Sequence, residues 1–274
     1  MILEVVIPAY NCECTIKRTL DSLVAQCNQD FSVLIVDDCS TQNIFAIVDG
    51  YSDKLSVRYL RNAENVGCGM TRQKGIDETS ADYITFLDSD DILLPNAIDI
   101  WLSEIEQTKP DIIYSPFFFV NKNGIIVRND GLCMCHGKVY SVSFLHKYDI
   151  GESPKVLCID DAYLNWQAFD LADKISILRD PTHVQIDTAG SITHTKKFLR
   201  NLLLDSPRAN KLASDKIKRF RDRPFERFNI IKNKVQLMLK EEAYNHQRAM
   251  NKIWNDMFLH KHKNNTIGGY ENET

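Results

Sequence analysis

The chain has 274 residues, of which 44% are hydrophobic and 26% are charged, and its formal net charge is −4. This length suits one α/β domain with elaborations or two small domains, with enough apolar residues for a sizeable core. No segment approaches the roughly 18 uninterrupted apolar residues of a membrane-spanning helix, and the first residues lack the pattern of a signal peptide, so we expect a cytoplasmic protein.

The first 95 residues alternate between strand-like and helix-like patterns. Short apolar segments rich in β-branched residues predict strands, and apolar residues at helical spacing predict helices. The strands are expected at residues 4–7, 32–36, 56–60 and 83–87, and the helices at residues 15–26, 44–48 and 70–79. Such alternation predicts an α/β fold with a mostly parallel sheet and helices on both faces. Ligands of such sheets bind at the carboxyl ends of the strands.

The pattern changes after Pro95. We expect a helix at residues 96–107, one long apolar strand at residues 111–120, and a hairpin turn at Asn123-Gly124. A loop containing cysteine and glycine then leads to a helix at residues 160–169 and a strand near residues 174–178. These elements predict an antiparallel addition that covers one side of the ligand cleft.

The C-terminal part is helical in pattern and basic. Residues 196–263 contain about 18 lysine and arginine residues against about 7 acidic ones, so the rest of the chain is strongly acidic. A basic segment of this kind favours a polyanionic partner, either nucleic acid or an anionic membrane. The alternative is an ordinary solvated helical face. Residues 264–274 are polar and contain glycine, and we expect them to be disordered.

The eight cysteines do not form a recognisable zinc motif. Cys12 and Cys14 are separated by one residue, as are Cys133 and Cys135, whereas zinc knuckles usually have two intervening residues. We therefore expect reduced structural thiols.

Acidic residues follow two of the expected strands. Asp37-Asp38 end the second strand, and Asp88-Ser89-Asp90-Asp91 follow the fourth. Like charges this close repel one another, and a Mg²⁺ or Mn²⁺ ion bound by carboxylate oxygens is the usual remedy. The alternative for the second group is a helix N-cap with an acidic first turn, because Leu93-Leu94-Pro95 begins a helical pattern.

Four motifs give the chain a family resemblance. They are VVIPAYN at residues 5–11, VLIVDDCS at 33–40, NVGCGMTRQKGI at 65–76 and DYITFLDSDD at 82–91, and a weaker match, CIDDAYLNW, lies at 158–166. As a set they resemble glycosyltransferase family 2, whose members have the GT-A fold and use nucleotide-diphospho-sugars. The resemblance implies a Rossmann-like GT-A sheet with a C-terminal helical extension. Residues 1–95 would bind the nucleotide-sugar, residues 96–195 would form the acceptor side, and residues 196–263 would be the extension.

The resemblance also implies roles for individual residues. Those implied to bind the nucleotide-sugar are Pro8, Tyr10, Asn11, Asp37, Asp38, Arg72, Asp88 and Ser89. Asp90, with Asp88, would hold Mn²⁺ or Mg²⁺ against the diphosphate. Asp161 would be the general base that takes the proton of the acceptor hydroxyl, with Asp160 and Trp166 on the acceptor side. One base and no enzyme nucleophile imply direct displacement with inversion.

The chain departs from the family pattern at two places. Many members have a histidine near the metal where this chain has Thr188, and His194 is a candidate replacement. Asp160 stands where a glutamate is common. A structural role is the alternative for Asp160-Asp161, because such a pair can cap a helix.

Three functions are open at this stage. The first is an inverting glycosyltransferase, with UDP as the expected carrier; the second is a nucleotidyltransferase; and the third is an inactive sugar-nucleotide-binding module. The nucleotidyltransferase is disfavoured because Tyr10–Glu13 replaces the Gly-rich loop usual after its first strand. The expected acceptor is a glycan or a lipid-linked glycan, which would place the chain at the inner membrane. DNA with a hydroxymethylated base, modified in a phage-infected host cytoplasm, is the alternative.

Overall fold

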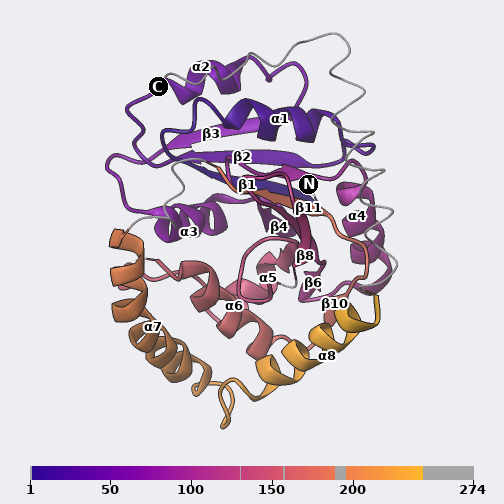
Figure 1. Cartoon of the computed structure of the whole chain (residues 1–274), viewed down its shortest axis with the longest axis vertical. Helices are drawn as coiled ribbons and strands as arrows, with labels where there is room; N and C mark the ends of the chain where they lie inside the picture. The colour runs from indigo at the N-terminus through magenta and orange to yellow at the C-terminus, as the bar shows by residue number, and fades with distance from the viewer. Residues whose placement is uncertain (1, 130, 157, 189–195, 243–274) are drawn as a thin grey trace. The chain divides into compact units, whose positions relative to one another are not determined.

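The computed structural model describes residues 2–129, 131–156, 158–188 and 196–242 (Figure 1). Residues 1–233 form one compact unit, and Lys234 begins a second. The expected disordered tail, residues 264–274, lies outside the described residues.

A seven-stranded sheet forms the centre of the first unit. Its strand order is β10-β6-β9-β4-β1-β2-β3. The strands are β1 (Leu3–Ala9), β2 (Ser32–Asp37), β3 (Val57–Arg61), β4 (Tyr83–Phe86), β6 (Ile112–Tyr114), β9 (Lys138–Ser141) and β10 (Ile175–Ile177). Only β9 runs antiparallel to its neighbours, β4 and β6, among the strand pairs described for this sheet. The expected mostly parallel α/β sheet is therefore confirmed.

Helices cover both faces of this sheet. Helices α1 (Ile16–Val24), α2 (Ile44–Asp49) and α4 (Ala97–Thr108) share one core cluster with alternate residues of β1. Helix α3 (Cys68–Glu78) lies on the opposite face, as Figure 1 shows for β1–β3. It packs so closely that a Cβ built on Gly75 would lie 2.3 Å from Val6 Cγ1, and only glycine fits there.

A smaller sheet has the order β5-β11-β7-β8. Its strands are β5 (Ile92–Leu93), β7 (Phe117–Val120), β8 (Ile126–Asn129) and β11 (His183–Ile186). The single strand expected at residues 111–120 is wrong, because the chain divides it at Ser115-Pro116 into β6 and β7, which join different sheets. Proline has no N–H to donate to a ladder. The hairpin turn at Asn123-Gly124 is confirmed, with Gly124 at a φ of 74°.

The segment expected to be a loop contains β9 and helix α5 (Val142–Lys147). Strand β9 opens with Lys138, which is fully buried and donates from Nζ to the carbonyl oxygens of Gly131 and His136. Because this strand begins with a lysine, it lacks the apolar pattern by which a buried strand is recognised in a sequence.

Helix α6 (Asp160–Leu171) and the two C-terminal helices follow. Helix α7 (Lys196–Ile217) packs Ala209 and Ala213 against Val156 and Tyr163, and α8 spans Glu226–Glu242. The expected helical extension is therefore present in the described part of residues 196–263.

Candidate active site

The acidic residues gather at one edge of the large sheet. Strand β2 ends at Asp37, and β4 ends at Phe86, just before Asp88. Both strands pair in parallel with β1, so their carboxyl ends meet at the same edge. Helix α6 brings Asp160 and Asp161 to this edge in its first turn.

Asp37 and Asp38 are buried and bonded within the chain. Asp37 accepts hydrogen bonds from the side chains of Ser40, Tyr59 and Arg61. Burial by itself would raise the pKa of Asp37, but the hydrogen bonds from Ser40 and Tyr59 hold it below its usual value. Asp38 accepts from the backbone N–H groups of residues 66 and 67 and from Asn62 Nδ2. Asp38 thus shapes the loop that leads into α3.

Arg72 connects Asp88 with the two aspartates of α6. Its side chain, from α3, is only 4% exposed. Its guanidinium donates to Asp88 Oδ1 at 2.8 Å and to Asp160 Oδ2 at 2.6 Å, and it also donates to Asp161 Oδ1. Asp161 Oδ2 accepts in addition from the backbone N–H of Cys135. The structure therefore brings together four residues that the sequence singled out separately.

A second glycine allows this arrangement. A Cβ on Gly69 in α3 would lie 2.8 Å from the Cβ of Asp160, so α6 could not approach as closely with any other residue there. Neither aspartate caps α6, since Ile159 occupies the N-cap position and makes no side-chain cap bond. The capping alternative for the pair is wrong because Arg72 takes up both carboxylates.

The two aspartates in the first turn of α6 ionise differently. Burial and the charge of Asp161 raise the pKa of Asp160 to about 6, although the Arg72 guanidinium opposes the shift. Burial would also raise the pKa of Asp161, but the Arg72 guanidinium and His136 hold it below its usual value. Asp161 is therefore the member of the pair that stays ionised to lower pH, and a proton acceptor must be ionised.

Asp90 lies in a different environment from Asp88. Its Oδ2 accepts a 2.8 Å hydrogen bond from Thr188 Oγ1. Burial, together with the neighbouring charges of Asp91 and Asp88, raises the pKa of Asp90 to about 6. A hard divalent cation held by Asp90 and Asp88 would remove this repulsion, so the donor set fits Mn²⁺ or Mg²⁺. His194 lies outside the described residues.

Asp91 does not cap a helix, which corrects that alternative. It is buried, and strand β5 follows it, with α4 beginning only at Ala97. Its Oδ2 lies 2.8 Å from His136 Nε2, and its Oδ1 accepts from the backbone N–H of Ile186. The helical reading failed because Leu93-Leu94 lie in and just after a two-residue strand that joins the second sheet.

Two buried histidines lie beside Asp91, and the sequence alone did not identify them as site residues. His136 comes from the segment before β9, and His183 begins β11. Neither has a motif around it, and they lie 47 positions apart in the sequence. Only the tertiary fold brings them together.

The other expected donor residues lie around the end of β1. Pro8 is inside β1, and Tyr10, just after it, is 49% exposed. Asn11 has a φ of 48°, and its Oδ1 accepts from the backbone N–H and the hydroxyl of Thr41. Ser89 is half-buried between Asp88 and Asp90. Tyr10 thus offers a ring for stacking at the same sheet edge as the carboxylates.

Trp166 lies on α6, beyond Asp161, and its ring meets Phe225 edge-on with the ring centroids 6.0 Å apart. Trp166 is therefore held by an aromatic residue from the C-terminal part of the first unit.

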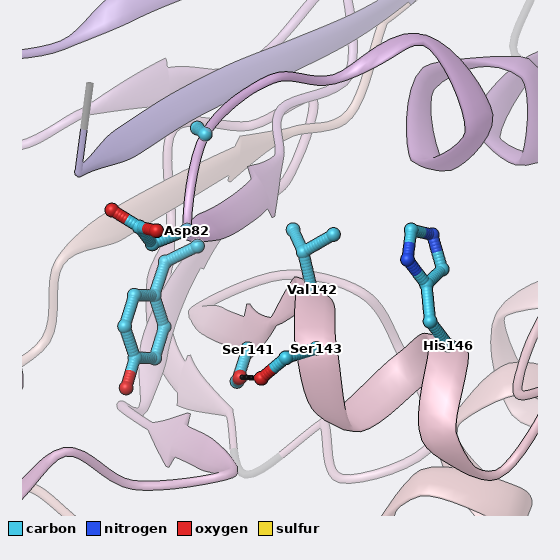
Figure 2. A pocket seen from close by; sticks show the side chains of 7 residues that line it. Asp82, Ser141, Val142, Ser143 and His146 are labelled. Atoms are coloured by element: carbon cyan, nitrogen blue, oxygen red, sulfur yellow. Dashed lines mark hydrogen bonds between the residues drawn. The ribbon is translucent and has the colours of Figure 1, made fainter.

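A shallow pocket of about 320 Å³ lies at the opposite end of the large sheet (Figure 2). It is lined by residues 81–83, at the amino end of β4, and by residues 141–143 and His146 around the start of α5. None of the candidate carboxylates lines it, and we assign it no role.

The basic residues of the C-terminal segment are largely paired where the structure describes them. Arg221 and Arg227 contact Asp173, and Lys216 and Arg219 contact Asp149. Positive charge that is already paired with an aspartate within the chain is less available to bind a polyanion. The polyanionic partner therefore stays a prediction. No helix in the described part of the chain combines the length and apolar character needed to cross a membrane.

The comparison with known families decides the assignment. The model of the family described as "Glycosyl transferase family 2" matches residues 4–143, which is more than half of the chain. The chain belongs to this family. The expected resemblance is thus confirmed, and the nucleotidyltransferase alternative loses its support.

Two curated relatives illustrate the similarity. The Escherichia coli protein "UDP-Glc:alpha-D-GlcNAc-diphosphoundecaprenol beta-1,3-glucosyltransferase WfgD" is 25% identical over 256 residues, covering 90% of this chain and 98% of that protein. "Poly(ribitol-phosphate) beta-N-acetylglucosaminyltransferase TarS" of Staphylococcus aureus is 26% identical over 197 residues, covering 66% of this chain and 34% of that protein. The chain therefore spans only about a third of some relatives that it matches.

Solved structures support the fold. TarS residues 1–349 in complex with UDP-GlcNAc align with a TM-score of 0.65 at 21% identity, covering 79% of this chain and 72% of that chain. At this identity the similarity shows the GT-A-like fold alone.

Proposed function

We propose that this chain transfers a sugar from a UDP-sugar to an acceptor hydroxyl, with inversion at the anomeric carbon. The observation that carries the proposal is the contact of one buried guanidinium, Arg72, with Asp88, Asp160 and Asp161. This contact joins a donor-side carboxylate to the candidate base. The UDP-sugars named for WfgD and for the TarS complex support UDP as the carrier.

On the donor side, Asp90 and Asp88 would hold Mn²⁺ or Mg²⁺, which when bound neutralises the charge that grows on a leaving diphosphate. Thr188 orients Asp90 through its hydrogen bond to Oδ2. Tyr10 and Asn11, after β1, would contact the base and ribose, with Asp38 setting the loop before α3. Residues 1–95 would thus provide the donor-binding part.

On the acceptor side, Asp161 would take the proton of the attacking hydroxyl at Oδ1 or Oδ2. Arg72 and the N–H of Cys135 fix its carboxylate in place, which limits the orientations from which it can accept a proton. Direct displacement needs one base and no enzyme nucleophile, and inversion follows from attack on the face opposite the leaving group. Asp160 and Trp166 would contact the acceptor as part of residues 96–195.

For the acceptor, we propose a glycan or a lipid-linked glycan at the cytoplasmic face of the inner membrane. The diphosphoundecaprenol-linked acceptor named for WfgD supports the lipid-linked class, since WfgD aligns over nearly its whole length. The named poly(ribitol-phosphate) acceptor of TarS supports a polymer bearing phosphate.

The test is donor turnover by the purified full-length chain with Mn²⁺ and a panel of sugar nucleotides. Release of UDP supports the proposal, release of pyrophosphate would indicate a nucleotidyltransferase, and no turnover of any donor would indicate a binding module. Product stereochemistry, followed by NMR at the anomeric carbon, tests inversion. A product that retains the donor's anomeric configuration would contradict direct displacement.

A further inference from the structure

We propose that Asp91, His136 and His183 form a second, buried metal site of the zinc type, separate from the donor cation held at Asp90 and Asp88. One potential ligand atom from each of the three residues lies within 4.8 Å of the others. All three side chains are buried, with His183 fully so. The proposal does not depend on the proposed transfer reaction.

The spacing of the atoms fits a small metal ion. Asp91 Oδ2 lies 2.8 Å from His136 Nε2 and 3.6 Å from His183 Nε2. Ligands about 2.0–2.2 Å from a tetrahedral Zn²⁺ are about 3.3–3.5 Å apart, so a small adjustment places all three at bonding distance. A water would supply the fourth ligand.

The hydrogen bonding of His183 points in the same direction. Neither of its ring nitrogens has a hydrogen-bond partner among the described residues, although the side chain is 0% exposed. Buried polar atoms without partners are costly, and each one calls for an explanation. Its Nε2 points close to Asp91 but stays beyond hydrogen-bond distance. A metal ion bound to Nε2 would satisfy this atom.

A simple ion pair explains less of the geometry. A protonated His136 would account for its short contact with Asp91, but it would leave His183 without a hydrogen-bond partner and beside a positive charge, with the two ring centroids 4.8 Å apart. Two neutral imidazoles and one carboxylate are a common donor set for Zn²⁺, and they suit it better than Mg²⁺ or Ca²⁺. The backbone N–H of Ile186 already orients Asp91 through Oδ1, as supporting bonds do around metal ligands.

Such a site would tie together three segments that are distant in sequence. Asp91 follows β4 of the large sheet, His136 precedes β9, and His183 begins β11 of the small sheet. Crosslinking these segments would fix the loop that carries Asp88 and Asp90. The role of the metal would therefore be structural, with its gain in stability coming from binding the folded chain alone.

The experiment uses the full chain, purified without a histidine tag, and measures zinc by mass spectrometry after gel filtration. We expect about one zinc per chain, or the same uptake when the metal-stripped protein is given Zn²⁺. Reconstitution with Co²⁺ should give the visible bands of a four-coordinate site without thiolate charge transfer. Wild-type protein that takes up no zinc, or cobalt bound through thiolates, would overturn the proposal.

Variants locate the site. His183→Gln and His136→Gln should each weaken zinc affinity by more than about 100-fold, since changes to mere supporting residues already cost about 10–100-fold. His146→Gln, in the pocket at the other end of the sheet, is the matched control and should bind zinc as the wild type does. Asp90→Asn should also keep the zinc while losing the Mn²⁺-dependent affinity for UDP. Equal zinc binding by His183→Gln and the wild type would place the metal elsewhere and refute the site.

Discussion

Arg72→Met tests whether one guanidinium holds the acidic site together. The change removes the positive charge and keeps a similar apolar stem. It leaves Asp88, Asp160 and Asp161 without the cation that contacts all three. Burial then acts on these carboxylates without their main compensating charge, so the folded state should lose stability at neutral pH.

The size of the loss follows from burial. Removing one partner of a buried ion pair costs about 3–5 kcal/mol. The Arg72 side chain is 4% exposed, but those of Asp160, Asp161 and Asp88 are 14%, 22% and 30% exposed, and water screens part of the repulsion. We therefore expect the lower end, about 3 kcal/mol. For a protein of this size, that loss lowers Tm by about 6–12 °C.

The stability difference between Arg72→Met and the wild type should also change with pH in a definite direction. In the wild type, the pKa of Asp161 is lowered despite its burial, so Asp161 contributes stability above the ordinary value of 3.8 and loses it as pH falls through the folded-state pKa. Without Arg72, burial shifts the pKa of Asp161 upward, and the folded variant takes up a proton at higher pH than the wild type does. The stability difference between the two proteins should therefore be largest near pH 7 and shrink below about pH 6.

Thermal and urea unfolding of both proteins across this pH range measures the difference. Arg223→Met is the control, because Arg223 is 80% exposed and pairs only with Glu226 at 3.4 Å among its recorded ion pairs. This control should leave stability unchanged at every pH. An Arg72→Met protein as stable as the wild type at pH 7, or one whose deficit is the same at pH 5, would refute the role of Arg72 as the internal counterion.

Three further predictions concern the reaction. Asp161→Asn should lower the rate of sugar transfer by about 10²–10⁴-fold, measured as UDP release with acceptor, while calorimetric affinity for UDP changes little. Since the pKa of Asp90 is raised to about 6, UDP affinity in the presence of Mn²⁺ should fall about tenfold for each pH unit below that value, measured by calorimetry. Gly69→Ala adds a Cβ 2.8 Å from that of Asp160, and it should reduce transfer up to about 100-fold with UDP binding retained, measured by the same two assays.

Each of these three predictions has its own control variant and its own result that would contradict it. Transfer that persists in Asp161→Asn would place the base elsewhere, and Asp215→Asn on α7 controls for the loss of an exposed carboxylate. Asp160→Asn separates the two groups with a pKa near 6, because UDP affinity should keep its pH dependence if Asp90 causes it. Gly50→Ala, whose new Cβ would meet only a carbonyl oxygen at 3.3 Å, should keep full transfer. An active Gly69→Ala enzyme would show that α6 tolerates a shift.

The sequence predicted the first half of the fold well because local pattern and tertiary structure agree there. Strands β1, β2 and β4 are apolar runs, and their acidic ends lie where a parallel sheet gathers its ligands. The second half was harder because its strands change sheets. Pro116 divides an apolar run that reads as one strand, and β9 opens with a buried lysine. Periodicity carries no information about which sheet a short apolar segment joins.

The site was predictable to the extent that its residues belong to motifs. Asp88, Asp90 and Asp161 could be named from the sequence, whereas the two histidines of the second cluster could not. His136 and His183 are single residues whose meaning depends on a contact with Asp91. A lone histidine in a sequence indicates no partner, so only the assembled fold identifies the group.

The tertiary contacts also explain how three carboxylates can occur within the four residues Asp88–Asp91. Asp88 turns to Arg72, Asp90 to Thr188 and Asp91 to His136, so each carboxylate has a partner from a different segment. Of the three, Asp90 has only a neutral hydroxyl as its recorded side-chain partner, and it is the one whose pKa is raised, to about 6. The negative charge of the DSDD motif that lacks a compensating partner is therefore that of Asp90. A divalent cation gains most by binding where the protein has left a carboxylate without a cation, and this makes Asp90 the principal ligand in the proposed donor site.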